Sequence, residues 1–206
     1  MEKTGEVVFG VSVTGGKDEG GKELPTVYQP QYEKRGLPGA VYEIIAAEDI
    51  ITPDGTVRNQ KGNVVDTVTT DENGTAVSRE LYLGKYEVRE ITAPHGMVLN
   101  PEPHCVELVY AGQNVAVTET ATSFENERQK VEISLVKSIE QNERFGIGTN
   151  GEMKNISFGL FAAEEIVSAS GTSIPANGLV EIISLNEDGT AKIKTDLPFG
   201  SYYVQE

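Results

Sequence analysis

The residues most able to do chemistry in this sequence are a glutamate, a lysine and an asparagine on otherwise apolar strand faces. They are Glu90, Lys137 and Asn126. In a β-strand, residues two apart share a face, so Glu90 shares a face with Tyr86 and Val88. Burying an unpaired carboxylate costs several kcal/mol, so we expect an inward-facing Glu90 to have a partner.

The same rule of alternation places the lysine and the asparagine. Lys137 ends a stripe made of alternate apolar residues in the run 131–135. Asn126 shares its strand face with Phe124. Each of the three polar groups is therefore predicted to point toward a core.

An amine, a carboxyl group and a carboxamide held together away from water can form a covalent crosslink. Desolvation lowers the pKa of a lysine and raises that of a glutamate, which favours a neutral amine and a proton-carrying acid. Attack of the amine on the carboxamide releases ammonia and leaves an isopeptide bond, and packing makes the step intramolecular. The alternative interpretation is that the glutamate pairs with a lysine or caps a backbone group, as buried charges usually do.

The surroundings of Glu90 recur later in the chain. The recurring residues are Gly84, Tyr86, Val88 and Glu90, repeated as Gly200, Tyr202, Val204 and Glu206; residues 44–50, repeated as 160–166; and residues 71–76, repeated as 186–191. We therefore predict two related domains in tandem, residues 1–128 and residues 129–206. Because the second copy ends at its glutamate, Glu206, we expect it to lack its last strands and the chain to be a fragment.

The pattern of both copies is typical of an all-β chain. Runs with a period of two, such as residues 106–110 and 131–135, are separated by turn sequences that end in Gly55, Gly74 and Gly189. Short strands at this spacing predict β-sandwiches. We expect the Gly-rich stretch 15–21 to be a mobile loop that opens an insertion, residues 15–35, in the first domain.

Composition excludes several classes of function. The net charge of −15 disfavours binding to nucleic acid or to an anionic membrane surface. A single cysteine allows no intrachain disulfide, and with two histidines it makes a zinc site unlikely on composition, so we expect no metal and no cofactor. No apolar run is long enough to span a membrane. No nucleophile in the sequence has a base and an orienting group, so we expect no enzyme.

Two blocks carry a resemblance to a known family. Residues 36–44, Gly-Leu-Pro-Gly-Ala-Val-Tyr-Glu-Ile, and residues 84–96, which contain Tyr-Glu-Val-Arg-Glu-Ile-Thr-Ala-Pro-His-Gly, resemble the Cna B-type (SpaA-like, prealbumin-like) repeat. Such repeats occur in surface adhesins and pilins of Gram-positive bacteria. The resemblance implies tandem Ig-like β-sandwiches, each with a first-strand lysine joined to a last-strand asparagine and an acid that promotes the bond.

The resemblance implies a role for each candidate residue. Glu90 matches the promoting acid and Asn126 the last-strand asparagine of the first repeat. Lys137 and Glu206 match the lysine and the acid of the second repeat, whose asparagine would lie beyond the sequence. Met97 stands where the family usually has tyrosine, a difference that we expect to affect packing alone.

The sequence does not decide which lysine serves the first repeat. Superposing the run 7–13 on residues 131–137 puts Val13 where the lysine belongs. Lys17 shares parity with Val13 and reaches the position after a two-residue slip, so it is our first choice. Lys3, which precedes the run, is the second choice, and a third possibility is that no lysine serves and Glu90 is merely paired.

These features together predict a structural stalk module of a bacterial cell-surface protein, stabilised by a self-formed Lys–Asn bond. Its partners would be neighbouring repeats of the same polypeptide, and its location extracellular, anchored through parts outside this segment. The alternative function is an adhesin that binds a host matrix protein or glycan through its loops, with the insertion 15–35 as the visible candidate surface. The self-modification is a single turnover and does not make the protein an enzyme.

Overall fold

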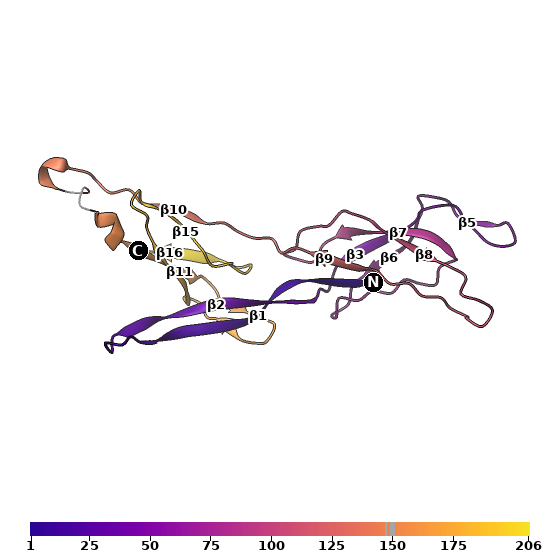
Figure 1. Cartoon of the computed structure of the whole chain (residues 1–206), viewed down its shortest axis with the longest axis horizontal. Helices are drawn as coiled ribbons and strands as arrows, with labels where there is room; N and C mark the ends of the chain where they lie inside the picture. Colours follow the sequence, from indigo (N-terminus) through magenta and orange to yellow (C-terminus); the bar gives the residue numbers. More distant parts are fainter. Residues whose placement is uncertain (147, 149–150) are drawn as a thin grey trace. The chain divides into compact units, whose positions relative to one another are not determined.

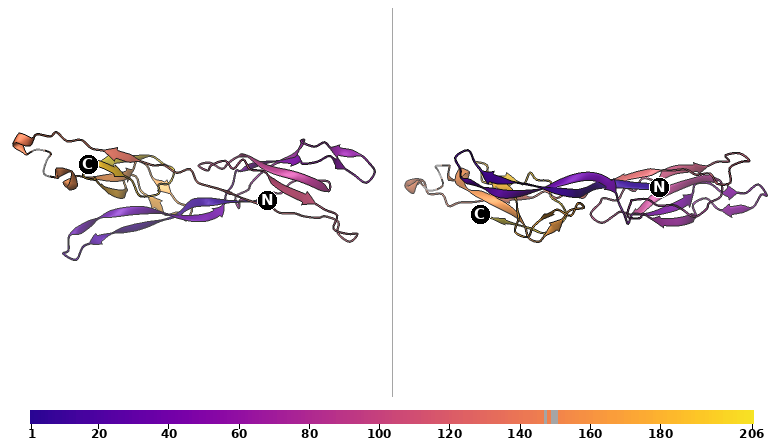
Figure 2. Two further views of the ribbon diagram at one scale, coloured as in Figure 1. Left: turned by 45° about the horizontal axis from the view of Figure 1, so that its top comes forward. Right: turned by 90° about the horizontal axis from the view of Figure 1, so that it is seen from below.

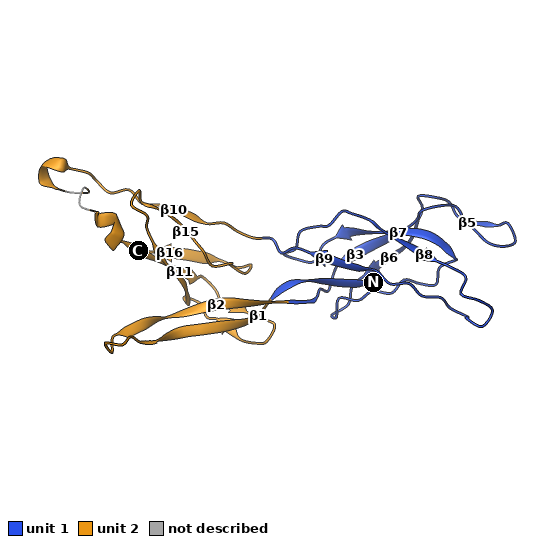
Figure 3. Ribbon diagram, in the orientation of Figure 1, with its two compact units in different colours: residues 1–7, 34–129 blue, residues 8–33, 130–206 orange. Residues whose placement is uncertain are grey.

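The computed structural model describes residues 1–146, 148 and 151–206, which form two compact units. Unit 1 comprises residues 1–7 and 34–129, and unit 2 comprises residues 8–33 and 130–206 (Figure 3). Strands make up nearly all of the regular structure (Figure 1), so the prediction of an all-β chain is confirmed. The helices of the described part are the short 3₁₀ segments η1 (Glu143–Phe145) and η2 (Glu152–Asn155), and none there is long and apolar enough to cross a membrane.

Unit 1 contains a four-stranded antiparallel sheet in the order β6-β3-β7-β8. Its strands are β3 (Val41–Ala46), β6 (Val64–Thr69), β7 (Gly84–Thr92) and β8 (His104–Leu108). Burial alternates along β3 and β7 as the period of two predicts, because successive side chains point to opposite faces. Tyr42 of β3 lies opposite Glu90 of β7, so these two residues are cross-strand neighbours.

The first and last strands of unit 1 run side by side. β1 (Glu2–Lys17) begins in this unit and pairs in parallel with β9 (Ser123–Asn126). The register places Lys3 opposite Phe124 and Gly5 opposite Asn126. A small hairpin, β4 (Ile50–Ile51) with β5 (Val57–Asn59), completes the unit.

The apolar core of unit 1 lies between the four-stranded sheet and β9. The buried members of this core are Ala40, Tyr42, Ile44, Ala46, Ile50, Val65, Tyr86, Val88 and Phe124. The ring centroids of Tyr42 and Phe124 are 4.7 Å apart, so the sheet and the last strand meet through aromatic contact.

Unit 2 contains an antiparallel arrangement of the same kind. β11 (Ser157–Ala162) lies between β14 (Leu179–Ser184) and β16 (Tyr202–Gln205). β10 (Ser134–Val136) pairs with β15 (Thr190–Lys192), and β12 (Ile166–Val167) pairs with β13 (Ser173–Ile174). The buried core of this unit comprises Leu160, Ala162, Ile166, Ile174, Val180, Ile183, Leu185, Ala191 and Leu197.

A long hairpin made of β1 and β2 (Glu23–Gly36) contributes residues 8–33 to unit 2. Both views of Figure 2 show its two strands side by side, and β2 pairs in parallel with β14. The main-chain N–H groups of Ala169 and Ser170 donate to the carbonyl oxygens of Val8 and Phe9 at 2.9 and 2.8 Å. The hairpin is thus hydrogen-bonded into unit 2 along both of its strands.

The hairpin departs from two expectations, the boundaries of the first domain and a mobile loop at residues 15–21. Residues 8–33 group with unit 2, whereas the sequence predicted that residues 1–128 form one domain. The physical reason is that Val11 and Tyr28 pack against the apolar core of unit 2. Most of the Gly-rich stretch is strand or tight turn, because Asp18 accepts hydrogen bonds from the main chain on the far side of the turn.

Candidate functional site

Glu90 points into unit 1, as its strand pattern predicted. It lies on the face of β7 that carries Tyr86 and Val88, and Glu90 as a whole is 2% exposed. Glu90 Oε2 accepts a hydrogen bond of 2.9 Å from the main-chain N–H of Asn100. Its other oxygen, Oε1, faces the lysine and the asparagine.

Lys3, Glu90 and Asn126 meet in the interior of unit 1. Lys3 Nζ lies 2.9 Å from Glu90 Oε1, and both side chains are fully buried. Lys3 Nζ also donates a hydrogen bond to Asn126 Oδ1. Asn126 Nδ2 donates to Glu90 Oε1 at 2.9 Å, so each of the three side chains contacts the other two.

The main chain holds Lys3 in place through a tight turn. The N–H of Lys3 donates to the carbonyl oxygen of Gly74 at 2.7 Å, and the N–H of Leu37 donates to the carbonyl oxygen of Lys3 at 3.0 Å. Gly74 has a φ of 76°, which glycine adopts without strain. A Cβ atom at this position would lie 2.4 Å from the carbonyl oxygen of Lys3, so the close approach requires glycine.

Burial sets the electrostatics of the site. Burial lowers the pKa of the Lys3 ammonium, and the hydrogen bond and charge of Glu90 only partly oppose this effect. The amine lies over the rings of Tyr42 and Phe124, 5.8 and 5.9 Å from their centroids. Burial and the Glu90 carboxylate raise the pKa of the Tyr42 phenol, which therefore stays protonated and donates to Glu90 Oε1 at 3.5 Å.

The arrangement brings a nucleophile, a proton carrier and an electrophile within reach of one another. A lysine of lowered pKa supplies an amine, and the carboxylate beside it can accept the amine proton. The carboxamide of Asn126 is an acyl group in direct contact with the amine, because its Oδ1 accepts a hydrogen bond from Lys3 Nζ. A site of this composition can carry out acyl transfer from asparagine to lysine.

Residues 29–123 match the family model of SpaA, described as a prealbumin-like fold domain. This part of the chain is similar to the SpaA prealbumin-like domain. The match spans β3 to β8, and so it contains Glu90 and its strand. Asn126 lies three residues beyond its end, whereas Lys3 lies 26 residues before its start.

The chain is also similar to a streptococcal surface protein. The chain is 26% identical over 147 residues to the trypsin-resistant surface T6 protein of Streptococcus pyogenes serotype M6. The aligned part covers 69% of this chain and 26% of that protein.

Two solved structures show a looser likeness. The Bacillus anthracis TIE protein is 18% identical, with a TM-score of 0.48 over 95% of this chain and 34% of that one. The full-length major pilin SpaD from Corynebacterium diphtheriae is 16% identical, with a TM-score of 0.35 over 93% of this chain and 50% of that one. Both scores are below 0.5, so the fold assignment rests on the family match and on the strands described above.

The structure places Lys3, not Lys17, beside Glu90. Lys17 is exposed at the end of β1 and belongs to unit 2. Val13, which the superposition put in the lysine position, is 58% exposed. The superposition pointed to Lys17 because it used the apolar run 7–13, of which residues 8–13 belong to unit 2, whereas Lys3 precedes the run.

Lys137 and Glu206 also pair, in a more open setting. Lys137 Nζ lies 2.6 Å from Glu206 Oε2, and the two side chains are 29% and 52% exposed. Glu206 is therefore open to solvent, whereas Glu90, the residue it matches in the first copy, is buried. Within the described part of unit 2, no strand pairs with β10 as β9 pairs with β1, so the lysine and the acid stay uncovered.

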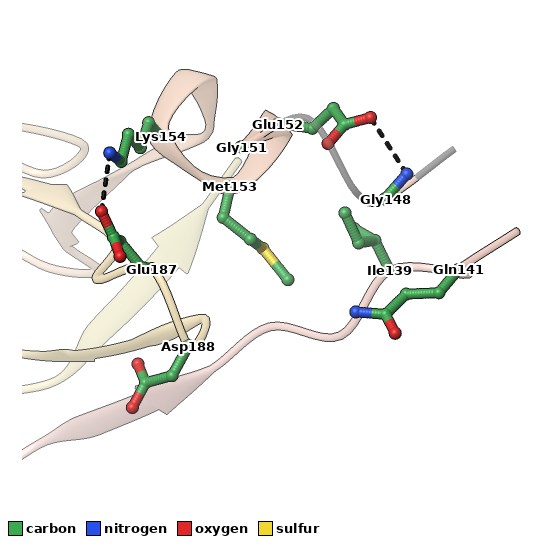
Figure 4. Close-up of a pocket in the computed structure, with 9 residues that line it drawn as sticks. All are labelled: Ile139, Gln141, Gly148, Gly151, Glu152, Met153, Lys154, Glu187 and Asp188. Atoms are coloured by element: carbon green, nitrogen blue, oxygen red, sulfur yellow. Dashed lines mark hydrogen bonds and ion pairs between the residues drawn. The ribbon is translucent and has the colours of Figure 1, made fainter. Parts of the chain in front are cut away.

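Two further features of the described part are a free cysteine and a pocket in unit 2. Cys105 is exposed, whereas the ring of the adjacent His104 stacks on Phe124 and its Nδ1 shares a hydrogen bond with Thr122. A pocket in unit 2 is lined by Ile139, Gln141, Gly148, Gly151, Glu152, Met153, Lys154, Glu187 and Asp188 (Figure 4). Its charged members include an ion pair of 2.7 Å between Lys154 and Glu187, and both of these side chains are exposed, unlike those of Lys3 and Glu90.

Proposed function

We propose that unit 1 joins Lys3 to Asn126 by an isopeptide bond and that Glu90 promotes the reaction. The observation that carries this proposal is the mutual contact of the three fully or nearly fully buried side chains. A buried ion pair alone is weak support for a stabilising role, because desolvation offsets most of its attraction. An ordinary ion pair would not need a third partner, whereas here the carboxamide of Asn126 contacts both charged groups.

The reaction balances with the groups at hand. Lys3 Nζ passes a proton to Glu90 Oε1 and attacks Cγ of Asn126. The Nζ–Cγ bond forms, the Cγ–Nδ2 bond breaks, and the acid carries two protons from Nζ to the departing nitrogen, one before the attack and one after it. A lysine ammonium and an asparagine carboxamide thus yield a secondary amide and one ammonium ion, with no cofactor and no second substrate.

A bond at this position would fasten the first strand of the unit to its last. The two residues are 123 positions apart. Closing a loop of this length stabilises a domain by about 5 kcal/mol on the loop-entropy estimate used for disulfides. Because β1 and β9 are parallel neighbours, tension applied through them would pass across the bond, and the strands between would not unravel.

We infer that the chain is a stalk module of a bacterial surface protein. The support is the SpaA-type match and the likeness to a streptococcal surface protein, of which the chain spans about a quarter. Unit 2 would be a second domain of the same type, with Lys137 and Glu206 as its lysine and acid. Its partners would be neighbouring modules of the same or adjoining subunits, outside the cell.

Intact mass measurement tests the bond. The parent chain is compared with Lys3→Met, Lys17→Met and Glu90→Gln. We expect the parent and Lys17→Met to be lighter than their sequences by one ammonia, and Lys3→Met and Glu90→Gln to have their full masses. A parent chain of full mass, or a loss that survives Lys3→Met, would overturn the proposal.

A further inference from the structure

The segment from Pro94 to Asn100 contacts both the acid and the chain that carries the asparagine. It leaves β7 just after Glu90 and turns at Gly96, whose φ is 78°, with the N–H of Met97 donating to the carbonyl oxygen of Pro94 at 3.0 Å. Its far end returns to Glu90 through the main chain of Asn100. None of its side chains belongs to the reacting trio.

At the acid, the segment fixes the oxygen that faces away from the reactants. Glu90 Oε1 receives the donors of Lys3 and Asn126, whereas Oε2 receives the N–H of Asn100 at 2.9 Å. A carboxylate held by one oxygen can still rotate about its last side-chain bond. A donor on Oε2 removes that freedom and keeps Oε1 aimed at the amine.

At its middle, the same segment is fastened to the residues that follow Asn126. The N–H of Val98 donates to the carbonyl oxygen of Glu127 at 2.8 Å, and the N–H of Gln129 donates to the carbonyl oxygen of Gly96 at 2.9 Å. A β-bridge joins Met97 to Arg128. Residues 94–100, called the splint below, therefore connect Glu90 to the residues that follow β9 through main-chain hydrogen bonds.

We propose that the splint, residues 94–100, is a positioning element for bond formation, with the main-chain N–H groups of Asn100 and Val98 as its two anchors. The inference rests on the proposed Lys3–Asn126 reaction. The splint sets where Oε1 lies relative to the carboxamide, since one anchor holds the acid and the other holds the strand end. Because main-chain donors do this work, a side-chain substitution that keeps the N–H leaves the reaction intact.

Replacement by proline tests each anchor, since proline has no N–H. The full chain is made in a cell-free translation reaction and quenched in denaturant at intervals, and its reacted fraction is read by intact mass. Asn100→Pro is compared with Asn100→Ala, which keeps the N–H and loses only the Asn100 Oδ1 contact to the N–H of Glu102. Val98→Pro is compared with Val98→Ala, a position whose side chain is half exposed. Hydrogen exchange of β3 and β7 gives the folded fraction of each chain.

We expect both alanine variants to react at the parent rate and both proline variants to react about 10- to 100-fold more slowly at equal folded fraction. If Asn100→Pro does not fold, Val98→Pro decides the question. A folded proline variant that reacts at the parent rate refutes the splint and leaves the bond intact. A parent chain that never loses ammonia refutes the proposed reaction, and the splint with it.

Discussion

Lys3 and Lys137 occupy the same place in their two units. The main-chain N–H of Lys3 donates to the carbonyl oxygen of Gly74, and that of Lys137 donates to the carbonyl oxygen of Gly189, at 2.7 and 2.9 Å. Each glycine has a positive φ, of 76° and 80°, and a Cβ on either would collide with the carbonyl oxygen of its lysine. The two lysines are thus equivalent by main-chain position, although the sequence around them differs.

The equivalence makes the turn glycine part of the site. In a Glu90→Gln background, where no bond forms, Gly74→Ala is expected to lower the free energy of unfolding of unit 1 more than Gly55→Ala. Both glycines have a positive φ, so each substitution strains the backbone by about 1–2 kcal/mol. Gly74→Ala adds overpacking of about 1–3 kcal/mol, because its Cβ meets Lys3 and Leu37, whereas a Cβ at Gly55 meets open space. Denaturant unfolding measures the difference, and equal losses would contradict the role of the close contact.

Two of the three side chains of the site could be predicted from the sequence. Glu90 and Asn126 follow from alternation along β7 and β9, since each stands two residues after a buried aromatic or aliphatic side chain. The recurring turn at residues 71–76 and 186–191 was visible too. What the sequence did not show is that this turn contacts the lysine, which depends on how distant strands pair.

The sequence did not identify the lysine of unit 1, because β1 begins in unit 1 and continues in unit 2. In unit 2 the apolar residues precede Lys137, whereas in unit 1 they follow Lys3 and serve a different core. Matching apolar runs therefore selected the wrong register. A usable signal was the short pair Lys3-Thr4, which resembles Lys137-Ser138. The Asn100 contact had no signal at all, because a main-chain N–H is present at every residue except proline.

Loss of the bond should cost unit 1 much of its stability. Lys3→Met alone would leave Glu90 buried without its partner, so the matched variant is Lys3→Met with Glu90→Gln, which removes both charges together. We expect its free energy of unfolding to fall by about 5 kcal/mol relative to the crosslinked parent, from loop entropy alone. Urea unfolding followed by tyrosine fluorescence gives the value, with Lys17→Met as the control that should match the parent. A double variant as stable as the parent would exclude a crosslink.

The stability of the uncrosslinked unit should rise with pH. Burial lowers the pKa of Lys3 in the folded chain, whereas an unfolded lysine keeps its ordinary value of 10.5. Between these two values the folded state binds fewer protons than the unfolded state, so the free energy of unfolding increases as the pH rises through this window. The test compares Glu90→Gln, which removes the carboxylate and forms no bond, with Glu90→Gln plus Lys3→Met, so that no buried carboxylate is left unpaired. As the pH rises from neutral to alkaline, the free energy of unfolding of the chain that keeps Lys3 should increase relative to that of the chain with methionine. A difference in free energy that does not change with pH would argue against a desolvated amine.

The hairpin 8–33 should stabilise unit 2 in preference to unit 1. Val11 packs against the core of unit 2, whereas Val13, two residues along the same strand, is 58% exposed. Removing two methyl groups from a partly buried valine costs about 1 kcal/mol, which corresponds to roughly fivefold faster exchange through global opening of that unit. Hydrogen exchange of the full chain should therefore accelerate in β11 and β14 for Val11→Ala and stay at the parent rate for Val13→Ala. Faster exchange in β3 and β7, with β11 and β14 unchanged, would assign the hairpin to the stability of unit 1 instead.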